Sequence, residues 1–278
     1  MSGATRLLVT GSGGRLGRLL RASCKRGDAD GTEIIFQSSR PGFDIAWEIG
    51  DGVGSLPRAD AILALWGVTS GTKKELIANS KLAELSTYIA QHIGAKRVLH
   101  CSSAAIYGQG ANMGEDYPPA PINAYGQAKL EMETHVAEIC AGKNCEHTVL
   151  RIANIVGADS LAPALTSSKP VTLDRFANGA GPLRSYLAAS DLLRVACALA
   201  QGSQKKSFDL LNIASPKPIA MEELAKAAGK DIVWRPAPST ATQEVSLNTN
   251  KLKSLIPNAI KIASAARMIE DWITLRGS

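Results

Sequence analysis

The chain of 278 residues has no long apolar run. None of its hydrophobic stretches approaches the ~20 residues that a helix needs to span a bilayer. The N-terminus, "MSGATRLLVTGS", also has no apolar core of the kind that marks a secretory signal, and its "RLLVT" is typical of a strand. We therefore expect a protein that is not targeted for export, with the cytoplasm as its default location.

Cysteine is scarce, and its spacing indicates neither a disulfide framework nor a zinc site. The chain has five cysteines, an odd number, scattered through apolar contexts: Cys24, Cys101, Cys140, Cys145 and Cys197. No group of histidines and cysteines has zinc-like spacing. The pattern predicts buried, reduced thiols and no bound metal.

Aromatic residues make up only 5% of the chain, and no basic stripe accompanies them. The 31 basic residues exceed the 25 acidic ones by six, but they are dispersed along the sequence. We therefore expect no nucleic-acid binding, although the net charge favours an anionic substrate. The sequence also has no "G-x-S-x-G" elbow after a strand, which argues against a serine hydrolase.

Strand-like and helix-like segments alternate regularly along the first half of the chain. Apolar runs predict strands at Leu7–Thr10, Glu33–Gln37, Ala61–Leu65, Arg97–Ser102 and Thr148–Ile152. Amphipathic segments predict helices near Gly14–Lys25, Lys73–Ile93 and Tyr125–Ala141. A βαβα order of this kind is typical of a parallel sheet with helices on both faces. We therefore expect an α/β fold with a Rossmann-type doubly wound parallel sheet.

The pattern changes after Arg151, where turn residues and short apolar runs dominate. A helix and the strand "FDLLNIA" follow, and residues from about 215 onward are typical of short helices and loops. We interpret residues 1–153 as the main domain, to which the chain returns near 183–213. Residues 154–182 and 214–278 are predicted to form a small C-terminal substrate-binding lobe.

A glycine-rich turn, "VTGSGGRLG", follows the first predicted strand directly. Gly11 allows a tight turn, Gly14 lets a diphosphate approach the backbone, and Gly17 lets the helix pack close to the strand. In this strand–turn–helix context the main domain is predicted to bind NAD(P). The residues expected to contact the cofactor in this turn and at the ends of later strands are Gly11, Ser12, Gly13, Gly14, Arg15, Leu16, Gly17, Ser38, Ser39, Arg40, Leu65, Trp66 and Gly67.

The end of the second predicted strand indicates which cofactor fits. An acidic residue there would accept hydrogen bonds from the ribose of NAD, but this chain has Gln37, followed by Ser38, Ser39 and Arg40. A 2′-phosphate would meet a guanidinium and two hydroxyls, with no carboxylate to repel it. We therefore expect NADP, with NAD as the alternative and an exposed loop cation as the other interpretation of Arg40.

The stretch "AYGQAKLEME" places Tyr125 and Lys129 four residues apart, so both lie on one face of the predicted helix. They are either a surface pair or an acid–base pair in which the ammonium activates the phenol. Hydroxyl groups stand at Ser102 and Ser103, at the end of the fifth predicted strand, and Ser103 together with the glycine turn favours the second interpretation.

Three motifs, "TGSGGRLG", "SSAAIYG" and "YGQAK", closely resemble those of the short-chain dehydrogenase/reductase superfamily. The chain resembles its extended branch in particular, the NAD(P)-dependent epimerase/dehydratase family, which acts largely on nucleotide sugars. "NSKLAELSTYIAQHIGAKRVLHCSS", "LRIANIVG" and "GPLRSYLAASDLL" are similar to further family segments in the same order. The resemblance covers nearly the whole chain.

The resemblance implies a catalytic set of Ser103, Tyr125 and Lys129. Tyr125 would exchange a proton with a substrate hydroxyl while hydride moves to or from the cofactor, and Ser103 would bind the same oxygen. A neighbouring ammonium and an oxidised nicotinamide both favour the phenolate. Lys129 would also bind the nicotinamide ribose, so it and Tyr125 join the cofactor-binding set.

Substrate contacts are expected from Ser103, Asn154, Arg184 and Arg235. The two arginines could bind a diphosphate or be structural. Two features leave the identity of the substrate undecided. The segment between Gly157 and Pro182 is short, and the chain has "LALWGVTSG" where the family often has "H-x-A-A" or "H-x-A-G".

We therefore expect an epimerase-type enzyme acting on a nucleotide sugar. An NADPH-dependent carbonyl reductase of a smaller substrate is the alternative, and a non-catalytic NAD(P)-sensing protein is the alternative from another class. A dehydratase is disfavoured because Ala104 and Ala105 follow Ser103 where an acidic pair would be needed. A homodimer formed through the helices near Lys73–Ile93 and Tyr125–Ala141 is also expected from the resemblance.

Overall fold

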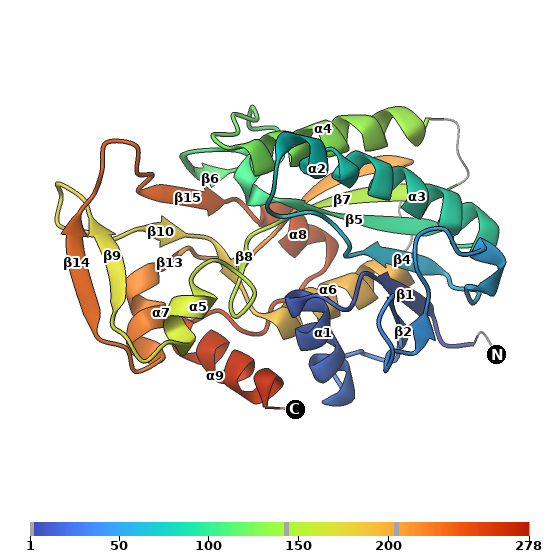
Figure 1. The fold of residues 1–278 in the computed structure, drawn as a ribbon, viewed down its shortest axis with the longest axis horizontal. Helices are drawn as coiled ribbons and strands as arrows, with labels where there is room; N and C mark the ends of the chain where they lie inside the picture. Colours follow the sequence, from blue (N-terminus) through green and yellow to red (C-terminus); the bar gives the residue numbers. More distant parts are fainter. Residues whose placement is uncertain (1–2, 142–144, 203–205, 278) are drawn as a thin grey trace.

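The computed structural model describes residues 3–141, 145–202 and 206–277. Within these ranges, seven strands form one parallel sheet in the order β12-β7-β5-β4-β1-β2-β3 (Figure 1). The strands are β1 (Arg6–Thr10), β2 (Glu33–Ser38), β3 (Ile45–Ala46), β4 (Ala61–Ala64), β5 (Arg97–Ser103), β7 (Glu146–Ile152) and β12 (Phe208–Ile213). The prediction of a Rossmann-type α/β fold is therefore confirmed, and each of the five predicted main strands agrees with an observed one to within two residues.

Helices cover both faces of this sheet. On one face lie α1 (Arg15–Lys25) and α6 (Ala189–Gln201), and on the other lie α2 (Lys73–Leu76), α3 (Ala78–Ile93) and α4 (Ala124–Ile139). The single helix predicted for Lys73–Ile93 is in fact two, which meet at Ile77. The Thr72 hydroxyl and the Glu75 carboxylate form a capping box that starts α2.

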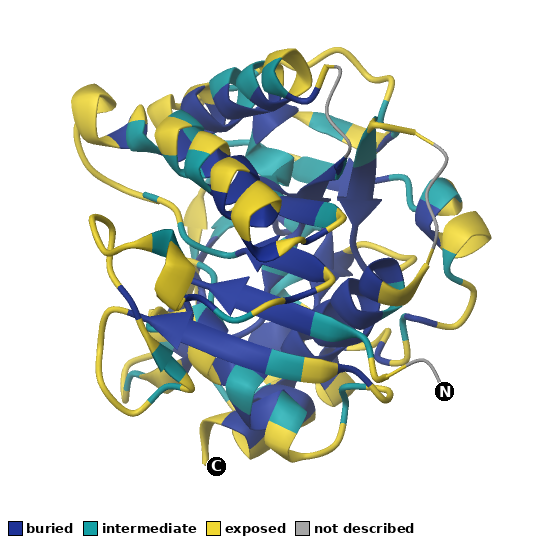
Figure 2. Cartoon of the chain, turned by 90° about the vertical axis from the view of Figure 1, so that its right-hand side faces the viewer, coloured by how far each residue is buried: buried dark blue, intermediate teal, exposed yellow. Residues whose placement is uncertain are grey.

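The core lies on both sides of the sheet because its central strands are apolar throughout. Leu7 and Val9 of β1 belong to the cluster beneath α1 and α6, whereas Leu8 packs with Ile62 and Ile89 beneath α3. All five side chains are fully buried. Figure 2 shows the buried strands between helices whose outer faces are exposed. Parallel strands covered on both faces need this continuous apolar sequence.

The smaller lobe contains more strand than the sequence predicts. Its elements are β8 (Asn154–Ile155), α5 (Ala162–Thr166), β9 (Val171–Arg175), β10 (Leu183–Arg184), β11 (Tyr186–Leu187), β13 (Ile219–Ala220), α7 (Met221–Ala227), β14 (Ile232–Pro236), β15 (Glu244–Leu247) and α8 (Asn250–Leu255). The expectation of only short helices and loops after residue 215 is therefore wrong for β13, β14 and β15. These strands are short, and their partners lie far away in the sequence, so they leave no periodic signal.

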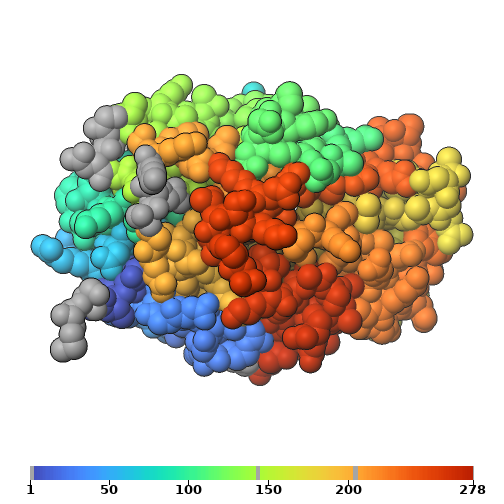
Figure 3. Space-filling model, turned by 180° about the vertical axis from the view of Figure 1, so that it is seen from behind, coloured from blue at the N-terminus to red at the C-terminus, as the bar shows by residue number. Residues whose placement is uncertain are grey.

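The two parts of the molecule share elements. A four-stranded sheet of the lobe, in the order β13-β10-β15-β6, includes β6 (Gly110–Met113), which the sequence analysis assigns to the main domain. In the other direction, α9 (Ala265–Arg276) packs on α1, α6 and α7. Figure 3 shows the C-terminal segment running over the back of the molecule beside N-terminal residues. The division into domains predicted above stays a prediction.

Three of the cysteines, Cys140, Cys145 and Cys197, are buried as expected, but Cys24 and Cys101 are only partly buried. In the part of the chain that the structure describes, no helix is both long and apolar enough to cross a membrane.

Candidate functional site

The glycine turn after β1 has the geometry that close packing demands. Gly11 has φ +71°, and a Cβ atom added to it would lie 2.6 Å from the Cα and Cβ atoms of Trp66. A Cβ on Gly17 would lie 2.2 Å from the carbonyl oxygen of Ser12. Neither position has room for a side chain, and Gly11 also has a backbone conformation that other residues rarely adopt.

Gly14 differs from these two glycines, because it faces open space. The nearest atom to an added Cβ is the Gly11 carbonyl oxygen, 3.9 Å away. Gly14 is the N-cap of α1 and no side chain caps this helix end, so the first backbone N–H groups are available to an anion. The residues present therefore fit a dinucleotide diphosphate.

A cavity of about 500 Å³ extends from this turn along the end of β2. It is lined by Gly11, Gly13, Gly14, Gln37, Ser38, Ser39, Arg40, Trp47, Glu48, Ile49 and Trp66. The predicted cofactor loop thus comes together with the glycine turn. The Ser38 hydroxyl accepts a hydrogen bond of 3.1 Å from the Arg40 backbone N–H, and the Arg40 side chain is exposed.

Gln37 is not free to contact a ribose. Its side chain is 3% exposed; Oε1 accepts from the Gly11 N–H at 2.9 Å, and Nε2 donates to the Trp47 carbonyl. The side chain therefore connects the glycine turn to the chain beyond β3. This role could not be predicted, because it depends on a partner that the fold brings close.

The expectation that no carboxylate lies near the cofactor loop is wrong, because Glu48 lines the same cavity. The two-residue strand β3 pairs with the end of β2 and carries Trp47 and Glu48 to this position. The Trp47 ring lies 6.2 Å from that of Trp66, centre to centre, and the Trp66 indole donates to the Ser86 hydroxyl at 2.9 Å. Sequence reasoning missed Trp47, Glu48 and Ile49, since a two-residue strand has no detectable period.

Ser103 and Tyr125 meet where β5 ends and α4 begins. Ser103 is the last residue of β5, and Asn123 caps α4 by accepting from the Gly126 N–H at 2.8 Å. The Ser103 side chain lies close enough to that of Tyr125 to act on the pKa of the phenol. A Cβ on Gly126 would lie only 2.5 Å from the Ala105 carbonyl oxygen, so this glycine lets α4 approach the segment after Ser103. The glycine of "YGQAK" was the available signal for this contact.

Lys129 lies one turn further along α4 and is 4% exposed. Its Nζ atom donates to the Cys101 carbonyl at 2.8 Å and lies 5.9 Å from the centre of the Tyr125 ring. Burial lowers the pKa of Lys129 to about 8, although Cys101 and Glu133 oppose this shift. Burial likewise raises the pKa of Tyr125, and the Ser103 side chain opposes that rise. The chain's own groups therefore do not produce the lowered tyrosine pKa that the sequence analysis expects with a cofactor bound.

The two halves of the site meet at the end of β4. Trp66 lies against Gly11 of the glycine turn, and its neighbour Gly67 lies against Lys129, whose Nζ would be 3.3 Å from an added Cβ. Asn79 of α3 approaches the same point, with its Oδ1 3.0 Å from that Cβ.

Asn79 holds the loop that follows β4. Its amide donates to the carbonyls of Val68 and Leu76, and its Oδ1 accepts from the Val68 N–H. The sequence analysis noted the segment that contains this residue but did not single out its side chain.

Three of the predicted substrate residues lie on neighbouring strands of the lobe: Asn154 pairs with Tyr186, beside Arg184, and Asp174 acts on both Arg184 and Arg235. Asn154 lies in β8 and is half-buried. The guanidinium of Arg184 donates to the carbonyls of Leu183, Thr242 and Gln243, and Arg235 on β14 forms a 2.6 Å ion pair with Asp174. Both arginines thus have partners within the lobe, and their contact with a substrate stays a prediction.

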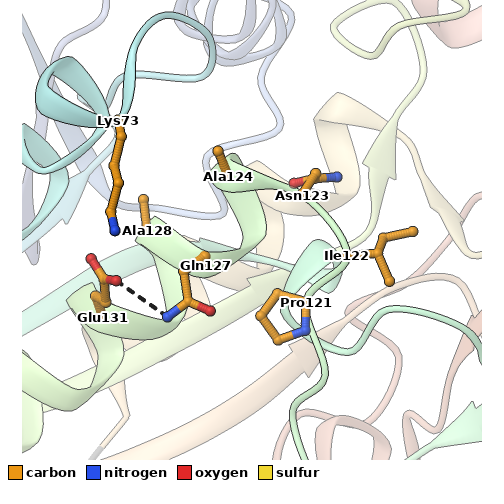
Figure 4. A pocket seen from close by; sticks show the side chains of 8 residues that line it. All are labelled: Lys73, Pro121, Ile122, Asn123, Ala124, Gln127, Ala128 and Glu131. Atoms are coloured by element: carbon orange, nitrogen blue, oxygen red, sulfur yellow. Dashed lines mark hydrogen bonds between the residues drawn. The ribbon is translucent and has the colours of Figure 1, made fainter.

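A second cavity, of about 370 Å³, lies on the outer side of α4 (Figure 4). It is lined by Lys73 of α2, by Pro121 and Ile122, and by Asn123, Ala124, Gln127, Ala128 and Glu131 at the start of α4. Tyr125 and Lys129 do not line it, so it is separate from the candidate site.

Comparison with known proteins agrees with this geometry. The model of the NAD dependent epimerase/dehydratase family matches residues 58–214, more than half of the chain. The chain belongs to this family, within the extended short-chain dehydrogenase/reductase superfamily. A relative from Kitasatospora kifunensis, dTDP-6-deoxy-L-talose 4-dehydrogenase (NAD(P)(+)), is 27% identical over 190 residues, which are 61% of this chain and 58% of that protein. The chain spans between 20% and 58% of the length of the curated relatives that it matches.

Solved structures share the whole fold. UDP-N-acetylglucosamine 4-epimerase from Bacillus cereus superposes with a TM-score of 0.79 at 19% identity, over 99% of this chain and 100% of that one. A short-chain dehydrogenase/reductase superfamily protein from Agrobacterium tumefaciens with bound NAD gives a TM-score of 0.76 at 19% identity, over 98% and 97% of the two chains.

Proposed function

We propose that the chain is an NAD(P)-dependent enzyme that transfers hydride at a hydroxyl or carbonyl carbon, with a nucleotide sugar as its substrate. The observation that carries this proposal is the meeting of Ser103, Tyr125 and Lys129 at the end of β5, next to the glycine turn. Family membership supports it, and so do the epimerases among the structural neighbours.

Tyr125 is the proton-transferring group in this proposal. Its hydroxyl removes the proton of a substrate alcohol or returns it to a carbonyl oxygen, while Ser103 hydrogen-bonds that oxygen. The bound nicotinamide supplies the acceptor or donor of hydride. Lys129, as an ammonium behind the phenol, stabilises the phenolate and binds the nicotinamide ribose.

NADP is the proposed cofactor. Ser38, Ser39 and Arg40 line the cavity at the end of β2, and Gln37 offers no carboxylate. Glu48, on the same cavity wall, is the observation that favours the alternative, because a carboxylate repels a 2′-phosphate and accepts from ribose hydroxyls. The bound NAD of the Agrobacterium neighbour also supports NAD.

An NADPH-dependent reductase of a smaller substrate is the second candidate. It is favoured by Arg184 and Arg235, whose guanidinium groups already have partners within the lobe and would have to exchange them to bind a diphosphate. Native mass spectrometry of the purified protein tests both candidates. Retained NAD(H) supports an epimerase, because an epimerase regenerates its cofactor without releasing it. An empty site that takes up NADPH supports the reductase, and no uptake of either dinucleotide contradicts the proposal.

We also propose a homodimer formed through α3 and α4. Each of these helices has one large exposed apolar side chain on it or beside it, Tyr88 on α3 at 48% and Ile122 just before α4 at 65%. Exposed apolar side chains of this kind are available for contact with a second copy of the chain.

A further inference from the structure

A buried row of polar side chains crosses the sheet directly behind the candidate site. Ser102 of β5 is the register partner of Arg151 of β7, and Arg151 is the register partner of Asn212 of β12. Adjacent parallel strands place such partners side by side on one face of the sheet. The three residues are 4%, 3% and 0% exposed, respectively, so water does not satisfy their polar groups.

Glu133 of α4 accepts hydrogen bonds from two members of this row, Ser102 and Arg151. The Arg151 guanidinium binds its carboxylate through Nε, 3.1 Å from Oε2, and through Nη2, 2.8 Å from the same oxygen. The Ser102 hydroxyl donates to Oε1. The side chains of Glu133 and Arg151 are both only 4% exposed, which makes this a fully buried ion pair.

The other end of the Arg151 guanidinium is also fixed. Its Nη1 donates to the Tyr107 hydroxyl at 2.7 Å and to the Glu115 carbonyl at 2.9 Å. Tyr107 in turn donates to Asn212, whose amide donates to the carbonyls of Met113 and Asn248. Arg151 therefore cannot turn away from Glu133 without breaking bonds on both sides.

Glu133 lies four residues after Lys129, which lies four residues after Tyr125, so all three occupy one face of α4. The groups that act electrostatically on Lys129 are Cys101 and Glu133, and Lys129 itself acts on His100 of β5. Asn79 of α3, which also approaches Lys129, is uncharged. Glu133 is thus the carboxylate that compensates the buried ammonium.

We propose that Glu133 is a positioning residue for Lys129: fixed by Arg151 and Ser102, its carboxylate lies one helical turn behind the ammonium and keeps it charged in the buried site. This inference rests on the proposed function, because the charge matters only if Lys129 supports Tyr125. A buried ion pair is a poor way to gain stability, since well-packed apolar residues of similar size often do as well. A role in keeping the Lys129 ammonium charged accounts for the presence of the buried Glu133–Arg151 pair better than stability does.

The test is a titration of the Lys129 ammonium by ¹⁵N NMR in protein with labelled lysine. The Lys129 signal is identified by its loss in Lys129→Arg. Glu133→Gln removes the negative charge and leaves Arg151 unpaired, so both effects should lower the pKa of Lys129 from about 8, by about one unit. Arg151→Gln leaves the carboxylate uncompensated and should raise it.

A matched control exists on the same two strands. Arg97 and Glu146 are register partners at the other end of β5 and β7 and form a 2.7 Å ion pair. Glu146→Gln should leave the Lys129 titration unchanged. Shifts in opposite directions for the two site variants, with no shift in the control, support the proposal. Shifts of the same sign, or no shift in Glu133→Gln, would overturn it and assign the pair to stability alone.

The double variant Glu133→Gln/Arg151→Gln keeps the test decisive if either single variant does not fold, because it removes both charges of the Glu133–Arg151 pair and leaves neither without the other. The pKa of Lys129 should still fall in this protein, since Glu133, which acts on the ammonium, is gone; an unchanged pKa would reject the proposal. The titration needs no substrate. Failure of the proposed function would appear separately, as normal turnover in Tyr125→Phe.

Discussion

The Nζ atom of Lys129 lies 5.9 Å from the centre of the Tyr125 ring, and the Ser103 side chain acts on the pKa of the phenol from the end of β5. The same Nζ atom donates to the Cys101 carbonyl at 2.8 Å, which connects the ammonium to β5. The phenol therefore lies between the end of β5 and the start of α4, and Tyr125 is partly buried.

Tyr125→Phe should keep the fold and cofactor binding but lower turnover by about 10²–10⁴-fold, because only the proton-transferring hydroxyl is lost. Circular dichroism, calorimetric titration with NADPH and steady-state kinetics on the substrate would measure the three properties. Tyr88→Phe, an exposed tyrosine on α3, is the control and should turn over normally. Near-normal turnover in Tyr125→Phe would end the proposed role.

Two glycines of the turn after β1, Gly14 and Gly17, should affect different properties: one the affinity for a dinucleotide and the other the stability of the fold. Gly14→Ala should cost little stability, because the added methyl enters open space, but it should weaken dinucleotide binding, because that space is where a diphosphate would lie. Gly17→Ala should instead lower the thermal unfolding midpoint strongly, because its methyl would lie 2.2 Å from the Ser12 carbonyl. Thermal melts and calorimetry on both variants test this. Equal losses of stability in the two would contradict it.

Arg40→Ala should weaken NADPH binding by about 1.5–3 kcal/mol, the range for a hydrogen bond to a charged group, and leave NADH affinity nearly unchanged. Arg58→Ala removes an equal charge from an exposed position outside the cavity and serves as the control. Calorimetric titrations of both cofactors would measure the differences. Should wild type prefer NADH, or should Arg40→Ala weaken both cofactors equally, Arg40 is only a loop cation.

Glu48 provides the complementary variant. Because its carboxylate lines the same cavity as Arg40, Glu48→Gln should increase the affinity for NADPH by removing a repulsion, and it should not increase the affinity for NADH. The same titrations apply. Unchanged NADPH affinity would mean that Glu48 lies beyond the reach of the phosphate.

Stability should depend on pH through Lys129. Burial lowers its folded pKa to about 8, whereas the unfolded value is about 10.4, so the unfolded chain binds more protons between these pH values. The stability of wild type relative to Lys129→Met should therefore rise with pH across this window, by about 3 kcal/mol in total. Below about pH 8 both states hold the proton, so the difference should level off at its lowest value. Urea unfolding of both proteins over this range measures the difference, and a difference independent of pH would contradict the buried ammonium.

The positions of Tyr125 and Lys129 could be predicted because both lie on one helix, where spacing alone places side chains. Glu133 is on the same helix and in the same quoted stretch, yet its role could not be predicted. Its partners Ser102 and Arg151 come from two strands, and only the parallel register of β5 and β7 brings them to it.

The same contrast holds in the cavity beside the glycine turn. The glycine turn could be predicted from its place between a strand and a helix. Trp47 and Glu48 could not, because β3 has two residues and reaches the cavity only by pairing with the end of β2.

The contact between α1 and α9 has a consequence for synthesis on the ribosome. Arg26, which follows α1, donates to Asp271 of α9 at 2.7 Å, and Asp271 also accepts from Ser190 of α6. The first helix of the nucleotide-binding half therefore remains partly uncovered until α9 has left the exit tunnel. A nascent chain stalled before α9 would therefore expose the apolar surface of α1 and α6 that α9 covers.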